Sequence, residues 1–244
     1  MTGIECFLKC IDQEDAAVAM NLLDYGEFVK LIEQHKILPF SGFIPEYPSL
    51  TAAASGNDWH TGTETDPWLW RIRVVEDGVA AYGKFFSDKA CFIHTDYFPA
   101  VRSILASGKT VDERYQDGLL SRTAYHLYKV LREHEHIDSR NLRIAAGLHA
   151  KESKKEYEKS LAELQNYGDV VITGAAQQND HASGWSSMCY QPSDVWLRSI
   201  ETNDVRVPIE DAKNQLIAEL LSSCSAKSLK FFARKLRLAE LGVI

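Results

Sequence analysis

The clearest pattern of hydrophobic and polar positions lies between residues 121 and 192. Its first part predicts an amphipathic helix, because apolar residues recur there at intervals of three and four. A short second helix is expected next, capped by Ser139 and stopped by Gly147, since glycine adopts the left-handed backbone that ends many helices. The apolar stripe of the first helix consists of Ala124, Leu127, Tyr128 and Leu131.

A third helix and a hairpin complete this segment. The helix is expected to enter through Ser153 and to end before Gly168. Residues 170–173 read as a strand, residues 174–184 as a polar tip, and residues 185–190 as the returning strand. Three helices followed by a hairpin are typical of a winged helix-turn-helix, in which the third helix and the hairpin tip share one exposed surface. The apolar face of the third helix carries Tyr157, Leu161 and Leu164.

The rest of the chain predicts further helices and two short strands. A helix is expected from Asp24 to Lys36, followed by a loop rich in Pro, Gly and aromatic residues at 38–48. Asp66 is expected to cap a helix whose first residue is Pro67. The expected face of that helix carries Trp68, Ile72 and Val75. The remaining elements are strands at 79–86 and 90–94, a helix from Thr95 or Asp96 to Gly108, a charged link at 110–118, and helices starting near Pro192, at Pro208 and around Leu229.

These elements predict a mixed α/β fold that is mainly helical. The expected parts are an N-terminal α/β subdomain with a Trp-rich segment at 1–120, a winged helix-turn-helix core at 121–192, and C-terminal helices at 193–244. The sequence shows no internal repeat. The first twenty residues are weakly patterned.

Composition favours a folded protein of a reducing compartment. The chain has 244 residues, and no apolar run reaches the roughly 18–20 residues of a membrane span. Its five cysteines are an odd, scattered set, which favours free thiols over disulfides. The acidic residues that follow Lys9 are not typical of a secretory signal. We therefore expect a cytoplasmic protein that does not bind membranes.

The charge is unevenly distributed along the chain. The net charge is −7, which opposes phosphate binding over the molecule as a whole. Residues 1–120 carry 10 basic and 18 acidic residues, net −8, whereas residues 121–244 carry 17 basic and 16 acidic residues, net +1. Local basic surfaces in the second half must therefore decide whether the protein meets nucleic acid.

Two groups of basic residues are candidates for binding DNA. One group lies at the start of the third helix, and the alternative for it is a solvated helix face with Glu–Lys pairs. The other lies on the last helix, and the alternative for it is an ordinary polar face or a surface for an acidic partner. The hairpin tip adds Gln177 and Gln178, which also suit an ordinary exposed hairpin. The first group surrounds the start of the third helix and consists of Arg140, Arg143, Lys151, Ser153, Lys154 and Lys155. The second group forms one stripe of the last helix and consists of Lys227, Lys230, Arg234 and Arg237.

The Trp-rich segment is the candidate for chemistry. Glu64 and Asp66 stand beside several aromatic residues, and a carboxylate near an exposed Trp could activate water beside a stacked base. The alternative is that Asp66 only caps its helix while the tryptophans pack between subdomains. The paired Cys and His residues lack the spacing of a closed metal site, and the sequence has no Walker A, GxGxxG or GxSxG motif. We therefore expect no metal and no cofactor.

The resemblance to a known family lies in Trp59-His60-Thr61-Gly62, Asp66-Pro67-Trp68-Leu69-Trp70, Ala81-Tyr82-Gly83-Lys84-Phe85, Phe92-Ile93-His94, residues 161–174 and the Trp185 strand. These segments resemble the AlkZ-related proteins, which are relatives of the AlkZ-type DNA glycosylases that unhook interstrand crosslinks. The resemblance spans about residues 38–240, and it implies a compact stack of winged-helix units with a channel that faces DNA. The glycosylases carry a Gln-x-Gln motif that positions the attacking water, and this chain has none, so no catalytic residue is transferred.

Three hypotheses follow from the sequence. The first is a DNA-binding protein of repair or regulation, with enzymatic activity left open. The second is an active base-excision glycosylase that uses Glu64 or Asp66. The third is a scaffold on which a winged helix serves small-molecule or protein interaction, and it leaves the identity of any small-molecule ligand unknown.

Overall fold

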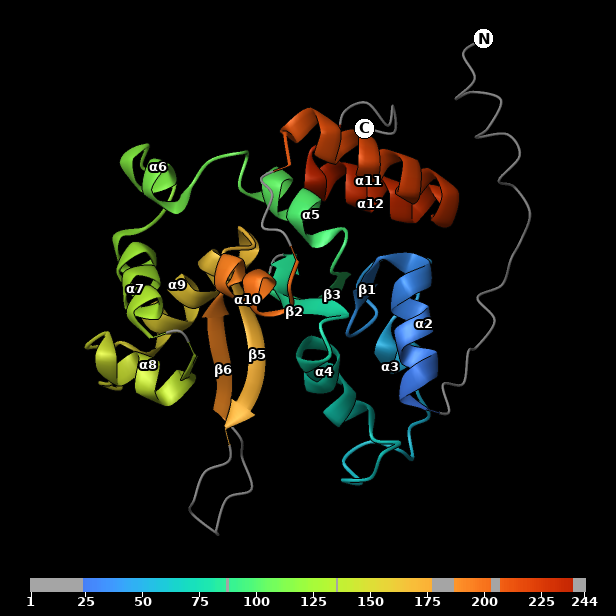
Figure 1. Cartoon of the computed structure of the whole chain (residues 1–244), viewed down its shortest axis with the longest axis horizontal. Coiled ribbons are helices and arrows are strands. Elements are labelled where there is room, and N and C mark those ends of the chain that lie inside the picture. Colours follow the sequence, from blue (N-terminus) through green and yellow to red (C-terminus); the bar gives the residue numbers. More distant parts are fainter. Residues whose placement is uncertain (1–23, 87, 135, 177–186, 203–206, 239–244) are drawn as a thin grey trace.

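The computed structural model describes residues 24–86, 88–134, 136–176, 187–202 and 207–238. Helices dominate a mixed α/β fold, as predicted (Figure 1). The first group of elements is α2 (Tyr25–His35), β1 (Ile37–Pro39), α3 (Leu50–Ala53), α4 (Pro67–Glu76), β2 (Ala80–Phe86), β3 (Lys89–His94) and α5 (Phe98–Leu105). After α6 (Val111–Gln116), the second group is α7 (Arg122–Glu133), β4 (Ile137–Asp138), α8 (Ser139–Ala145), α9 (Lys154–Asn166), β5 (Val170–Ala176), β6 (Ser187–Pro192) and α10 (Ser193–Ser199). The last two helices are α11 (Ile209–Ser223) and α12 (Ala226–Leu236).

The two groups share one order of elements and one sheet topology. In each group a helix, a short strand, two helices, two strands and a helix follow one another. The sheets have the orders β1-β3-β2 and β4-β6-β5, and all of these pairings are antiparallel. Because the sequence shows no internal repeat, the repetition lies in the topology and not in the residues.

The two groups pack on each other reciprocally. Helix α4 of the first group contacts β5 of the second, α9 of the second contacts β2 of the first, and β2 contacts β5. The Gln165 side chain of α9 accepts a hydrogen bond from the backbone N–H of Lys84 in β2 at 3.0 Å. One hydrophobic cluster extends from Phe28 to Leu238, and α11 and α12 cover α5 (Figure 1).

The helical stripes predicted from residue spacing are largely confirmed. Helix α9 buries the predicted Tyr157, Leu161 and Leu164. Helix α7 buries Ala124, Leu127, Val130 and Leu131, whereas the predicted Tyr128 is only half-buried. In α4 the prediction was partly wrong, because Trp70, Val74 and Val75 form the buried side while Trp68 and Ile72 are half-buried.

Two helix starts differ from the prediction. The Asp138 side chain, not Ser139, caps α8, because it accepts from the backbone N–H groups of Arg140 and Asn141. Helix α5 begins at Phe98 and not near Thr95. The cap of α4 is as predicted, with Asp66 before Pro67. Asp138 and Ser139 are adjacent, and both residue types are good N-caps, so the sequence alone did not distinguish which of the two caps α8.

Two predicted connections contain regular structure. The charged link at 110–118 holds α6, whose Thr110 and Glu113 form a reciprocal capping box. The loop at 38–48 overlaps the end of β1, whose residues pair with β3. Within the described residues, no helix combines the length and the apolar character needed to cross a membrane.

Candidate nucleic-acid interface

One arginine holds the turn between α8 and α9. The Arg143 guanidinium donates to the carbonyl oxygens of Leu148 at 3.2 Å, His149 at 3.2 Å and Ala150 at 3.1 Å. It also lies 5.6 Å from the centre of the Tyr157 ring. Arg143 is a predicted DNA-binding residue, but its guanidinium is engaged within the turn, so we assign it to positioning the start of α9.

Two further side chains tie α7, α8 and α9 together at this turn. The Tyr157 hydroxyl of α9 donates to the Ser139 carbonyl oxygen at 3.2 Å. Burial raises the pKa of Tyr157 to about 12, so the hydroxyl keeps its proton at neutral pH. In α7, His126 Nε2 lies 3.2 Å from the Ala146 carbonyl oxygen. The start of α9 is therefore presented on a fixed support.

Three exposed lysines surround the start of α9. They are Lys151, Lys154 and Lys155. Lys154 Nζ lies 3.7 Å from Glu158 one turn later, and an exposed pair of this kind holds a lysine only weakly. Thr123 of α7 donates to the Glu156 carboxylate at 2.5 Å, which directs this acid toward α7.

Two further predicted residues lie at the start of α9 and on α8. Ser153 is the N-cap residue of α9 and is half-buried, and its side chain makes no capping hydrogen bond. Arg140 is exposed on α8. The predicted Gln177 and Gln178 lie outside the described residues. Of the predicted residues on α8, Arg143 is the one whose contacts join the turn and α9.

The predicted basic residues of α12 form a separate surface. Lys227, Lys230, Arg234 and Arg237 are exposed, while Leu229, Phe232 and Leu236 on the opposite side are buried. Lys227 is paired with Glu46. Figure 1 shows α12 and α8 at opposite ends of the molecule. The two predicted basic groups are therefore not one continuous surface.

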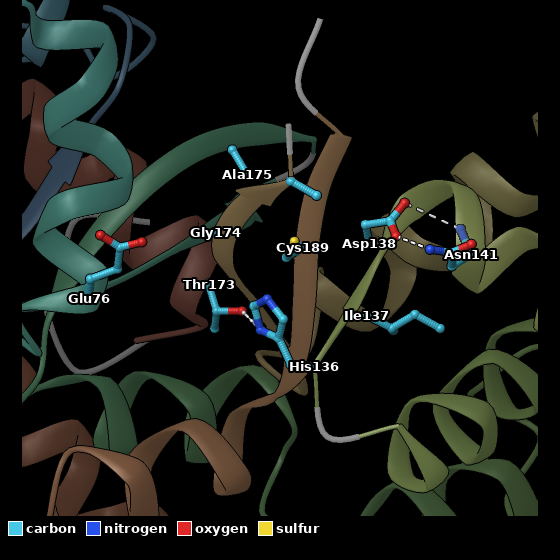
Figure 2. A pocket seen from close by; sticks show the side chains of 10 residues that line it. Glu76, His136, Ile137, Asp138, Asn141, Thr173, Gly174, Ala175 and Cys189 are labelled. Atoms are coloured by element: carbon cyan, nitrogen blue, oxygen red, sulfur yellow. Dashed lines mark hydrogen bonds between the residues drawn. The ribbon is translucent and has the colours of Figure 1, made fainter. Parts of the chain in front are cut away.

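A pocket of about 340 Å³ lies beside the C-terminal half of β5, with β4 and the start of α8 among its walls (Figure 2). His136 Nδ1 lies 3.2 Å from the Thr173 hydroxyl, and Glu76 of α4 faces this pair across the pocket. Asp138 lines another part of the pocket. Burial acts to raise the pKa of Asp138, but the hydrogen bonds that its carboxylate accepts from the backbone N–H groups of Asn141 and Arg140 have the larger effect and hold the pKa below its usual value. The pocket is thus lined by polar groups next to the α8–α9 unit.

Asp66 and Glu64 occupy different environments. Asp66 is 1 % exposed, and its carboxylate accepts from the backbone N–H groups of His60 at 3.0 Å, Gly62 at 2.9 Å and Trp68 at 2.9 Å. The Glu64 side chain is 93 % exposed and lies 3.3 Å from Arg73. The geometry gives Asp66 a capping and loop-organising role and leaves Glu64 on the surface.

The Trp-rich segment is packed rather than open. Trp70 is buried and donates through Nε1 to the Glu64 carbonyl oxygen at 2.8 Å. Trp68 is half-buried, with the Arg71 guanidinium 3.5 Å from the centre of its ring. The His60 ring lies 4.9 Å from Trp68 on this side of the loop.

Sequence reasoning missed a buried ion pair between α6 and the start of β5. Arg114 is 1 % exposed and Asp169 is 2 % exposed, and their side chains are paired. Arg114 also donates to the Lys109 carbonyl oxygen at 2.7 Å and lies over the Tyr167 ring at 4.4 Å. Burial raises the pKa of Asp169 to about 6, although Arg114 acts to lower it. The one available signal was the Thr110–Glu113 capping box, which marks a helix where a link was expected.

The comparisons with known proteins agree with the resemblance drawn from the sequence. A family model described as AlkZ related matches residues 22–237. The chain belongs to this family. For the AlkZ-related chain, searches of curated proteins and of solved structures found no match. The matched residues include the two groups of elements, α2 to α5 and α7 to α10, and the basic residues of α8–α9 and of α12. The family's description relates the chain to AlkZ. Within the described residues, no three His, Cys, Asp or Glu side chains are grouped as a metal site requires.

Proposed function

We propose that residues 121–192 form a winged helix-turn-helix that binds duplex DNA through the α8–α9 turn and the start of α9. The order α7, β4, α8, α9, β5, β6 and the sheet order β4-β6-β5 support this assignment. Membership of the AlkZ-related family supports a role in DNA repair or its regulation. The first group of elements, with the same order, is the second unit of this kind.

The observation that carries the proposal is the exposed lysine cluster on a rigid support. Arg143, Tyr157 and His126 fix the turn, so the backbone that carries the lysines needs little ordering on binding. Lys151 and Lys155 are exposed at the helix start, where the helix dipole favours phosphates. The stripe on α12 is proposed as a second, separate phosphate contact.

The proposal is tested by the salt dependence of DNA affinity. Replacement of Lys151, Lys154 and Lys155 by Ala is expected to reduce the slope of log affinity against log salt by about two to three units, because each lost phosphate contact removes about 0.9. Fluorescence anisotropy with a labelled duplex measures this slope. The matched control replaces Lys30, Lys109 and Lys213, which removes three charges from α2, the α5–α6 connection and α11. An unchanged slope in the first variant, or an equal loss in both, would refute the proposed interface.

Catalysis is not part of the proposal. Asp66 is buried and its carboxylate is engaged with the backbone, while Glu64 is paired with Arg73 at the surface. No observation on these two residues favours a water-activating role. The function is therefore proposed as DNA binding, with base excision left to a direct assay of base release from alkylated or crosslinked duplex.

A further inference from the structure

Lys159 lies one helical turn beyond Lys155 on the outward side of α9. Residues three or four apart share one side of an α-helix, so Ala162 lies on this side as well. Leu161 and Leu164 are buried on the opposite side of α9, whereas both lysines are exposed. Lys155, Lys159 and Ala162 therefore form one ridge that faces away from the core, and we call it the outer ridge of α9.

The acids next to the outer ridge are engaged with α7. Glu163 lies one turn after Lys159, where a Lys–Glu pair would be expected. Its carboxylate instead accepts from the backbone N–H of Ser121 at 2.9 Å and from the Ser121 hydroxyl at 2.6 Å. Glu156 likewise accepts from the Thr123 hydroxyl. Within the part of the chain that the structure describes, Lys159 has no ion-pair partner, so its charge is available to a ligand.

A third acid of α9 does not neutralise Lys159 either. The Glu158 carboxylate lies 3.7 Å from Lys154 Nζ. Lys154 is five residues before Lys159, which places the two lysines about 140° apart around the helix. They therefore meet different parts of a bound duplex, and experiment can separate their roles.

The chemistry of the outer ridge matches one edge of one base. Ala162 follows Lys159 along the ridge, and its single methyl group allows the helix backbone to approach a groove floor closely. A lysine ammonium only donates hydrogen bonds. In the major groove, guanine offers two adjacent acceptors, O6 and N7, whereas adenine and cytosine present an amino group there.

We propose that Lys159 reads guanine in the major groove by donating to O6 and N7. This inference rests on the proposed DNA-binding function of α9, and it adds a base contact to the phosphate contacts of the helix start. The DNA site it implies is a duplex with guanine opposite the second turn of α9.

A matched pair of duplexes tests the base contact. The wild-type protein first selects duplexes from a random pool. A selected duplex is then made with guanine or with 7-deazaguanine, which lacks the N7 acceptor and keeps O6, the base pairing and the phosphates. We expect the 7-deazaguanine duplex to bind about fivefold more weakly, because a hydrogen bond from a charged donor is lost. Fluorescence anisotropy measures both affinities, and equal affinities or a selection without sequence enrichment would overturn the proposal.

Two lysine variants locate the contact. Lys159→Ala should bind both duplexes equally, because the donor to N7 is absent. Lys154→Ala should lose affinity for both duplexes by the same factor and keep the preference for guanine, because its expected contact is a phosphate. A preference that persists in Lys159→Ala would refute the role of Lys159. Since Lys159 is exposed, its replacement should leave folding intact, which circular dichroism checks.

The outcomes also separate this role from the proposed function. If the wild-type protein binds neither duplex, DNA binding and the role of Lys159 both fail. If the Lys151, Lys154 and Lys155 variant shows the reduced salt slope but guanine and 7-deazaguanine duplexes bind alike, DNA binding stands and only the base contact of Lys159 is refuted.

Discussion

Asp66 shows how a single buried carboxylate organises a segment of this protein. Its three backbone hydrogen bonds start α4 and also hold the loop in which His60 has a φ of 60° and Gly62 a φ of 70°. A left-handed conformation is unfavourable for a non-glycine residue, so His60 depends on this support. The residue that looked like a candidate base is thus the local support of the fold.

Replacement of Asp66 by Ala is expected to lower the free energy of unfolding by about 2–4 kcal/mol. The reason is the loss of a helix cap together with two further buried acceptor contacts. Urea unfolding followed by circular dichroism measures the change. Glu64→Ala is the control, and because Glu64 is exposed its effect should stay within about 0.5 kcal/mol. Equal effects of the two substitutions would contradict the capping role.

At the scale of elements, α6 is the clearest difference from the sequence prediction. Its six residues include two acids in the first turn and no long apolar stripe, so its pattern resembles a charged link. What holds it in place is the pair of Arg114 and Asp169, which are 55 residues apart. A contact between residues so distant in the chain leaves no periodic signal.

This pair predicts a specific pH dependence. Because burial raises the pKa of Asp169 to about 6, the folded protein holds this proton more tightly than the unfolded chain does. The stabilisation that comes from the bound proton on Asp169 is therefore fully present below pH ~4. It is lost as the pH rises through 6, which lowers the free energy of unfolding by about 2–3 kcal/mol. Carbon NMR of the carboxyl group measures the pKa in the folded protein. A titration midpoint below 4 would show that Arg114 dominates and would reverse the sign.

At the scale of the whole molecule, reciprocal packing joins two units of the same topology. The buried residues form one cluster across both units and the C-terminal helices. The predicted divisions at residues 120 and 192 stay predictions. The second half of the chain carries both basic surfaces, but folding places them at opposite ends (Figure 1).

Separate surfaces predict additive effects on DNA affinity. The α12 variant with Lys230, Arg234 and Arg237 replaced by Ala should lower log affinity by an amount that adds to the loss in the α9 variant, because residues without shared partners act independently. Anisotropy titrations of the two triple variants and of their combination measure this. A combined variant no weaker than the α9 variant alone would remove α12 from the proposed DNA contact.

The candidate site was predictable in part. The lysines at the start of α9 follow from the spacing of its apolar stripe, since opposite faces of a helix separate by sequence position alone. The role of Arg143 does not follow from the sequence. Its three acceptors are carbonyl groups of a turn, and the types of the side chains do not determine the shape of that turn. A cleft of about 650 Å³ that Pro99, Tyr128 and Asp194 help to line was not foreseeable either, since its lining residues come from helices far apart in the chain.

Local physics therefore determined most of the helices, most of their buried faces and the cap at Asp66, because these depend on neighbours within a turn or two. Tertiary structure decided which of Trp68 and Trp70 is buried, where the basic surfaces lie, and that two units share one topology without a repeat in sequence. These features depend on contacts between segments that are distant in the chain. Such contacts bury side chains and pair charges only once the chain has folded.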